Sequence, residues 1–238
     1  MEEPENLISH SEESPPSKWS GLAVRAASAA VLALIFALVL WKGGWIFIWF
    51  VIMAALMMMR EWTNITEHEG ALWRFAGLFY VSIPCASLIW LRNVNFIDTQ
   101  NTGIYLVLYV ILIVVATDIG AYFTGRQIGG PKLAPSISPN KTWAGLGGGV
   151  VAAGAVGGLS LFFVPFPATI IGGILLGMVM AVIAQAGDLF ESWQKRKAGV
   201  KDSGTLIPGH GGLLDRIDGL IPTLPLFAVL VALSGRVL

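Results

Sequence analysis

The sequence has little charge and almost no cysteine. Only 13% of its 238 residues are Asp, Glu, Lys or Arg, whereas soluble domains carry about a quarter. The single cysteine, Cys85, lies inside an apolar run and excludes an intramolecular disulfide. The formal net charge is zero, which gives no indication of a nucleic-acid partner. With 55% hydrophobic residues and a mean hydropathy of +0.72, a soluble globular domain is excluded as well.

The sequence consists largely of long apolar runs with few charged residues in them. About 20 helical residues cross the hydrocarbon core, and helix is favoured because lipid offers free backbone groups no partner. We therefore expect an all-α polytopic membrane protein, a bundle of about seven transmembrane helices with a polar site that faces the cytoplasm. The predicted spans are Leu22–Leu40, Gly44–Met59, Leu72–Leu91, Gly103–Gly125, Trp143–Val164, Ala168–Ala186 and Leu220–Leu233.

Lysine and arginine are concentrated in alternate connections. Loop 60–71 begins with Arg60, loop 126–142 holds three basic residues and loop 187–219 holds five. Short cytoplasmic loops are enriched in such residues. These loops are therefore predicted to be cytoplasmic, together with an acidic, disordered tail over residues 1–20, where Glu, Pro and Ser predominate. Residues 21–102 would form the N-terminal transmembrane helices.

The segment from Asp188 to Asp218 carries ten of the 30 charged residues, five of each sign. Asp188, Ser192, Lys195 and Arg196 are spaced to lie along one face of a helix. Carboxylates bind hard cations such as Mg²⁺, which keep phosphate oxygens as further ligands. The segment is therefore predicted to hold a metal-bound polyphosphate, with a solvated basic helix end as the alternative.

The turn Pro208-Gly209-His210-Gly211-Gly212 follows this helix. Its glycines permit backbone angles that aim N–H groups at an anion. Asp215 and Asp218 come next, three residues apart. Aspartates at a membrane helix end are costly unless they are paired or bind metal, so Asp188 and Asp215 are the preferred metal ligands. For Asp218 a network of ion pairs that only joins helices is a serious alternative.

Two further candidates precede this segment. Ser138-Pro139 is typical of a helix start, with Ser138 as N-cap, and the free N–H groups would bind phosphate together with Lys141 and Thr142. Asp118 lies inside the fourth predicted span, where an ionisable group is a functional candidate. A structural partner for a basic residue of another helix is the alternative for Asp118.

The charged residues between the last two spans resemble a known signature. They read Ser192-x2-Lys195-Arg196-x4-Lys201-Asp202-x-Gly204-x2-Ile207-Pro208-x-His210-Gly211-Gly212-x2-Asp215-Arg216-x-Asp218. This pattern is similar to that of the phosphatidate cytidylyltransferase (CDP-diacylglycerol synthase) family. The segments GDLFES, TDIGAY and SPNKTW resemble its accompanying motifs, so the resemblance covers about residues 115–220. Gln194 and Ala144 depart from the family pattern, but neither position is a proposed ligand.

The resemblance implies an integral enzyme of the bacterial inner membrane, with its active site facing the cytoplasm. It would condense CTP with phosphatidate to give CDP-diacylglycerol and pyrophosphate, with Mg²⁺ as cofactor and room for a second cation such as K⁺. Residues 103–238 would be the catalytic transmembrane region. CTP, phosphatidate and membrane lipids are the expected partners, a homodimer is compatible with the family, and no nucleic acid is expected.

The residue roles follow from the motif and the local chemistry. The predicted metal ligands are Asp118, Asp188, Asp215 and Asp218. The predicted catalytic residues are Asp188, Lys195, Asp215 and Arg216. The predicted substrate-binding residues are Ser138, Lys141, Thr142, Ser192, Arg196, Lys201, Asp202 and His210. A lipid phosphate with a second pKa near 6 is already largely a dianion at neutral pH, so His210 is expected to orient the turn or donate a hydrogen bond and not to act as a base.

Two alternatives remain from the sequence. An ion-coupled transporter would also suit Asp118 and the glycine-rich helices. It predicts charged groups near the midplane, whereas the charges of this chain cluster at one surface. A related lipid-phosphate nucleotidyl- or phosphotransferase with another lipid substrate is the second alternative, because no pattern identifies recognition of cytosine or of diacylglycerol.

Overall fold

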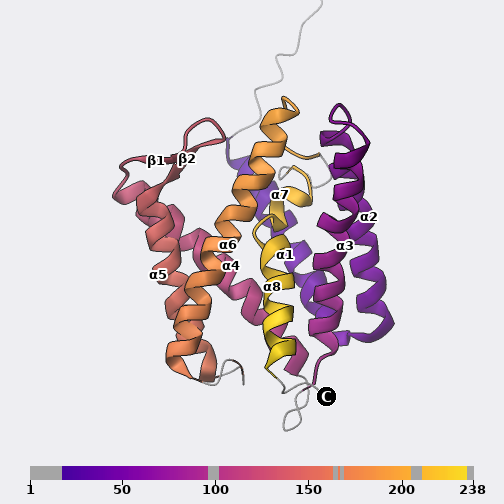
Figure 1. The fold of residues 1–238 in the computed structure, drawn as a ribbon, viewed down its shortest axis with the longest axis vertical. Coiled ribbons are helices and arrows are strands. Elements are labelled where there is room, and N and C mark those ends of the chain that lie inside the picture. Colours follow the sequence, from indigo (N-terminus) through magenta and orange to yellow (C-terminus); the bar gives the residue numbers. More distant parts are fainter. Residues whose placement is uncertain (1–17, 96–101, 163–165, 167–168, 205–210, 235–238) are drawn as a thin grey trace, which may run out of the picture.

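A computed structural model describes residues 18–95, 102–162, 166, 169–204 and 211–234 (Figure 1). The long helices are α1 (Lys18–Lys42), α2 (Gly44–Ile65), α3 (Ala71–Asn93), α4 (Thr102–Gln127), α5 (Trp143–Leu159), α6 (Ile170–Lys197) and α8 (Leu220–Leu233). The short elements are α7 (Leu214–Ile217), a 3₁₀ turn (Ser160–Phe162) and the strands β1 (Lys132–Ala134) and β2 (Ser138–Thr142).

Each predicted span overlaps one long helix, while Val164 and Ala168, at the predicted end of the fifth span and start of the sixth, lie outside the described residues. Helices α2, α3, α4 and α6 are long and apolar enough to cross a membrane, while α5, α8 and residues 26–42 of α1 are shorter apolar helices. The chain is an integral membrane protein of helical architecture, and the count of seven crossings stays a prediction. Helix α1 begins at Lys18, within the segment predicted as tail, and residues 1–17 lie outside the described part.

The core runs along α4, whose buried side chains include Leu106, Val110 and Ile113. They belong to a cluster with Phe227 and Val231 of α8. Large apolar side chains also cover the outside of the bundle, where lipid replaces water as the solvent. The hydrophobic pattern therefore marks spans but does not by itself show which helix face is inside.

Small residues bring α5 and α6 close together. A Cβ atom added at Gly157 would lie 2.2 Å from the backbone oxygen of Gly173, and one at Gly177 would lie 2.3 Å from that of Ala153. Close backbone approach through small residues is a common mode of helix packing in membranes. The glycines of α5 that meet α6 are thus packing residues, as their place in an apolar helix indicates.

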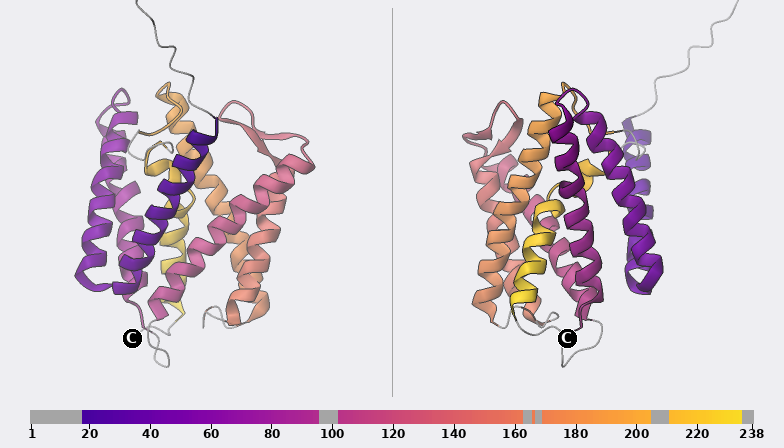
Figure 2. Two further views of the ribbon diagram at one scale, coloured as in Figure 1. Left: turned by 180° about the vertical axis from the view of Figure 1, so that it is seen from behind. Right: turned by 45° about the vertical axis from the view of Figure 1, so that its right-hand side comes forward.

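The polar connections gather at one end of the bundle. The α2–α3 turn, the β1–β2 hairpin and the C-terminal end of α6 lie at this end, while the α1–α2 turn and the C-terminal end of α8 lie at the other (Figures 1 and 2). The alternation of basic loops predicted this grouping, and the cytoplasmic orientation of the polar end stays a prediction.

The prediction of a helix start at Ser138 is wrong, and the fold is not purely helical. Ser138–Thr142 forms β2, which pairs antiparallel with β1. Proline disfavours the helical conformation in the residue before it, which keeps Ser138 extended. Thr142 is the N-cap of α5 instead, and its hydroxyl accepts a hydrogen bond of 3.0 Å from the Gly145 N–H.

Candidate functional site

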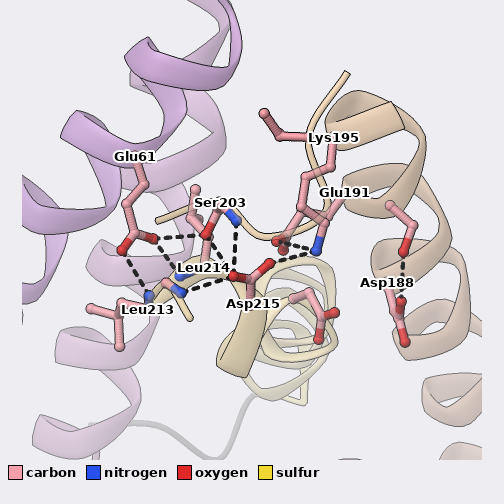
Figure 3. A network of polar contacts seen from close by, with 12 residues as sticks. Glu61, Asp188, Glu191, Lys195, Ser203, Leu213, Leu214 and Asp215 are labelled. Carbon is pink, nitrogen blue, oxygen red and sulfur yellow. Dashed lines mark hydrogen bonds and ion pairs between the residues drawn. The ribbon is translucent and has the colours of Figure 1, made fainter. Parts of the chain in front are cut away.

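Two polar groups lie near the C-terminal part of α6. The first, here called the aspartate group, comprises Asp118, Asp188 and Asp218. The second, here called the carboxylate network, comprises Glu61, Glu191, Lys195, Ser203 and Asp215. Figure 3 shows this network between α2 and α6, with α7 in the middle.

Asp188 joins the hairpin to α6. Its carboxylate lies 2.5 Å from Nζ of Lys141, which belongs to β2. It also accepts a hydrogen bond of 3.2 Å from the hydroxyl of Ser192, one helical turn later. The two polar loops that the sequence predicts to share a site therefore meet at this residue.

Asp218 adds negative charge to the aspartate group. Its burial, followed by the charge of Asp188, raises the pKa of the Asp218 carboxyl to about 7, against the opposing effects of the Gly219 N–H and Lys141. Asp118 contributes in the same direction as Asp188. The side chain of Asp118 accepts a hydrogen bond of 3.4 Å from the Gln185 amide. Three carboxylates thus influence one another electrostatically, and Lys141 balances only part of their charge.

This excess of carboxylate oxygen fits a divalent cation. Mg²⁺ is usually bound by one or two carboxylates and completed by phosphate oxygens and water. Among the described residues, no group of three or more His, Cys, Asp or Glu side chains is placed to hold a metal ion by itself. Mg²⁺ held by these carboxylates together with phosphate oxygens of a substrate stays a prediction.

Asp215 has hydrogen bonds at both oxygens. Oδ1 lies 2.5 Å from Nζ of Lys195. Oδ2 accepts from the Gly212 N–H at 2.8 Å, the Ser203 N–H at 2.9 Å and the Ser203 hydroxyl at 3.0 Å. Burial alone would raise the pKa of Asp215, but the bonds from Lys195, Gly212 and Ser203 together lower it. Its predicted role as a metal ligand would require release of some of these bonds.

Lys195 is held between two carboxylates. In addition to Asp215, its ammonium lies 3.2 Å from a carboxylate oxygen of Glu191, whose side chain is fully buried. Glu191 is one of the five acidic residues between Asp188 and Asp218, and the sequence indicates no role for it. In this arrangement Lys195 forms ion pairs with Asp215 and Glu191. Its predicted contact with a substrate phosphate stays a prediction.

Glu61, like Glu191 and Ser203, is a member of the network that the sequence does not identify. Its carboxylate accepts hydrogen bonds of 2.8 Å from the N–H groups of Leu213 and Leu214. The sequence feature that could have pointed to Glu61 is an acidic residue two positions after Met59, where the apolar run ends. Helix α2 continues past that predicted end and carries Glu61 into the interior.

The other predicted residues spread around the polar end. Arg196 is exposed and donates hydrogen bonds to the carbonyls of Ile137 at 3.3 Å and Val200 at 3.1 Å, so it lies against the hairpin turn. Lys201, Asp202 and Arg216 are exposed, and Ser138 is half-buried in β2. His210 lies outside the described residues.

An apolar groove of about 370 Å³ lies beside the network. Residues of α2, α3, α6 and α8 line it, among them Trp62, Ala76, Tyr80, Phe190 and Pro222. Phe190 follows Asp188 by two positions, so the groove and the aspartate group share one stretch of α6. Among the described residues, the buried hydroxyl of Tyr80 has no hydrogen-bond partner.

Comparisons with known proteins agree on one family. The model of the cytidylyltransferase family matches residues 71–234. The phosphatidate cytidylyltransferase of Brucella suis biovar 1 is 43% identical over 183 residues, which are 77% of this chain and 62% of the relative. The phosphatidate cytidylyltransferase of Rickettsia bellii is 37% identical over 214 residues, or 87% of this chain and 89% of the relative. That of Staphylococcus haemolyticus is 32% identical and covers 87% and 98%.

Proposed function

The chain belongs to the cytidylyltransferase family, and on that premise we propose that it condenses CTP with phosphatidate to give CDP-diacylglycerol and pyrophosphate. The observation that carries the proposal is the meeting of Lys141 and Asp188 on a stretch of α6 whose Phe190 lines an apolar groove. A reaction between a nucleotide and a lipid phosphate needs charged and apolar surfaces in contact. The aspartate group and the groove supply them from the same part of α6.

The reaction needs two anions to be held together. The phosphate oxygen of phosphatidate would attack the α-phosphorus of CTP, and the bond to the leaving pyrophosphate would break. Because the lipid phosphate is already largely a dianion near neutral pH, no strong base is required. Fixed positive groups aimed at the phosphates are the main requirement. Lys141 and Arg196, which lie at the hairpin, and the exposed Lys201 and Arg216 are the proposed phosphate-binding cations.

Asp188 and Asp218 are the proposed holders of Mg²⁺, with Asp118 beside them. When bound, this cation would neutralise charge on the phosphate oxygens. The electrostatic influence of Asp188 and Asp118 on Asp218 supports this choice. Asp215 stays a proposed ligand that would have to exchange its bonds to Lys195, Ser203 or Gly212. Its bonds in the present arrangement support a role in fixing Lys195 and the turn before α7.

The groove is the proposed place for an acyl chain of the lipid. Its lining is aromatic and aliphatic, and exposed side chains such as Phe79 and Ile83 lie on its rim, so it opens towards lipid. Ala76→Trp would fill it and should raise the KM for phosphatidate without changing the KM for CTP. Leu78→Trp, on a face of α3 that does not line the groove, is the matched control. Equal effects of the two variants would contradict this assignment.

We further propose that all seven long helices cross the membrane and that the polar end faces the cytoplasm, where CTP is available. The clustering of the basic connections at that end supports this orientation. An ion-coupled transporter is less well supported, because the described charged groups that contact one another lie towards this end.

The decisive test is an incubation of the purified protein with Mg²⁺, phosphatidate and each labelled nucleoside triphosphate in turn. We expect lipid-extractable label only with CTP, and none with Asp188→Asn. A panel of other lipid phosphates separates this activity from that of a related transferase. Label that appears with every nucleotide, or with none, would contradict the proposal.

A further inference from the structure

Glu61 lies in α2, before the segment 71–234 that matches the family model. The residue is only 5% exposed. Its neighbours on the same face, Met58, Trp62 and Ile65, are buried in a cluster with Leu214. A carboxylate among apolar side chains in a membrane helix is costly unless it is hydrogen-bonded. The position of Glu61 therefore calls for a specific set of partners.

Those partners belong to the polypeptide that carries Asp215. The N–H groups of Leu213 and Leu214 donate to the two oxygens of Glu61, and the hydroxyl of Ser203 lies 3.1 Å from one of them. Leu214 begins α7, and Asp215 is the next residue. Glu61 thus binds the backbone immediately before Asp215 from the side of α2, across from Lys195 of α6 (Figure 3).

Ser203 connects the two acids directly. Its hydroxyl lies 3.1 Å from Oε2 of Glu61 and 3.0 Å from Oδ2 of Asp215. A hydroxyl has one proton, so it can donate to only one of these carboxylates at a time. The backbone N–H groups of Ser203, Gly212, Leu213 and Leu214 supply the remaining bonds. The two carboxylates are therefore oriented by one shared set of donors.

Two glycines leave room for this arrangement. A Cβ atom at Gly212 would lie 2.0 Å from the Ser203 hydroxyl oxygen and 2.7 Å from Oε2 of Glu61, and one at Gly204 would lie 3.0 Å from Oε1. A side chain at Gly212 would therefore displace Ser203 or the Glu61 carboxylate, and one at Gly204 would press against the same carboxylate. The two glycines thus help to keep the Glu61 carboxylate in its place.

We propose that Glu61 is a positioning residue for the reaction, which acts through Ser203 and the backbone of 212–214 to place Asp215 and, through Asp215, Lys195. This inference rests on the proposed function and extends it to a helix outside the matched segment. The alternative is an anchor that only stabilises the bundle. The two differ because an anchor affects how much protein folds, whereas a positioning residue affects the rate of the folded protein.

The test uses Glu61→Gln in the full-length protein, purified in detergent. The amide keeps the size of the side chain but turns one accepting oxygen into a donor that faces N–H groups. We expect kcat of the folded protein to fall on the order of 100-fold, as for a slight misplacement of catalytic groups, with little change in the KM for CTP. Such a split indicates the loss of interactions made in the transition state.

A second variant, Ser203→Ala, keeps the proposal testable if Glu61→Gln folds poorly, and Glu67→Gln serves as the control for both. Ser203→Ala removes the shared hydroxyl but keeps the N–H bond to Asp215, so a smaller fall in kcat is expected. Its effect should not add to that of Glu61→Gln, because both changes disrupt one set of bonds. Glu67→Gln, an exposed acid in the turn after α2, is the control and should keep wild-type kinetics. Wild-type kcat in both Glu61→Gln and Ser203→Ala would overturn the proposal.

Hydrogen exchange provides a measurement that needs no activity. The amides of Leu213 and Leu214 should exchange faster in Glu61→Gln than in the wild type or Glu67→Gln. If the wild type makes no CDP-diacylglycerol, the proposed function fails while this measurement still tests the placement of the segment. Unchanged exchange at both amides would overturn the inference whatever the activity.

Discussion

Lys141 and Asp188 form an ion pair of 2.5 Å that joins β2 to α6. Both side chains are partly exposed, at 18% and 27%, although the Nζ atom of Lys141 is itself buried against Asp188. A phosphate that binds Lys141 competes with Asp188, and a cation that binds Asp188 competes with Lys141. The arrival of a nucleotide and a metal together would replace one ion pair with two new charge pairs, so neither residue would be left unpaired at any point.

Substitution of Asp188 should impair turnover and the use of Mg²⁺, whereas substitution of Lys141 should impair the binding of CTP. Asp188→Asn should lower turnover on the order of 100-fold or more, as found when one charge-stabilising group is removed from an active site, and should raise the Mg²⁺ concentration needed for activity. Lys141→Gln should mainly raise the KM for CTP. Lys132→Gln, an exposed change in β1, is the control. Initial rates over a range of Mg²⁺ and CTP concentrations measure both effects, and near-wild-type rates for Asp188→Asn would contradict the assignment.

Asp218 should make the stability of the protein depend on pH. Its pKa in the folded protein, about 7, lies above the ordinary value of 3.8. Between these values the folded state binds a proton that the unfolded state has lost, so this residue lowers stability as the pH rises through that window. With EDTA present, Asp218→Asn should therefore raise the Tm more at pH 8 than at pH 5. A Tm gain that is equal at both pH values would contradict the shifted pKa.

Close packing of α5 and α6 predicts a contrast between two glycines. Gly157→Ala would place a methyl group 2.2 Å from the backbone oxygen of Gly173, whereas a Cβ at Gly147 meets nothing within 4 Å. Overpacking costs about 1–3 kcal/mol, so Gly157→Ala should lower the Tm. Gly147→Ala should be neutral or slightly stabilising. Thermal unfolding in detergent measures both variants, and equal tolerance would mean that the helices can move apart freely.

Orientation can be tested by cysteine labelling in a Cys85→Ser background. Single cysteines at Lys132 and Lys201 should react with a membrane-impermeant thiol reagent only when it reaches the cytoplasm. A cysteine at Lys42, at the opposite end of the bundle, should react from outside intact cells. Modification of Lys201→Cys from outside would invalidate the proposed orientation and the shared cytoplasmic site.

Much of the architecture could be predicted from local sequence. Apolar run length located every long helix, and the alternation of basic loops grouped Lys141 with Asp188. The hairpin escaped prediction because its strands are short and Pro139 suits both a first helical turn and an extended segment. Thr142 has the hydroxyl that a helix cap requires, but Ser138 offers the same chemistry four residues earlier.

Glu61 could not be identified in this way. Its contacts with Leu213 and Leu214 span 152 and 153 residues of sequence, and no periodicity within α2 indicates them. The same holds for Asp215, whose pairing with Lys195 and Ser203 depends on how three separate segments fold together. The position of Asp215 at a membrane helix end predicted that it needs a partner, but only the tertiary structure shows which donors stabilise Asp215 and Glu61.

The long separation between Glu61 and its partners also bears on how the protein is made. Synthesis proceeds at about 5–20 residues per second, so α2 emerges roughly 8–30 seconds before Leu213 and Leu214 exist. During that interval an acidic side chain in an apolar helix lacks the N–H groups that will later surround it. Leu213 and Leu214 stand among the final 26 of the 238 residues, so water at the membrane surface is the partner open to the Glu61 carboxylate until almost the whole chain is made. The order of synthesis thus leaves the contact between α2 and the start of α7 to form late, after the other long helices except α8 have been made.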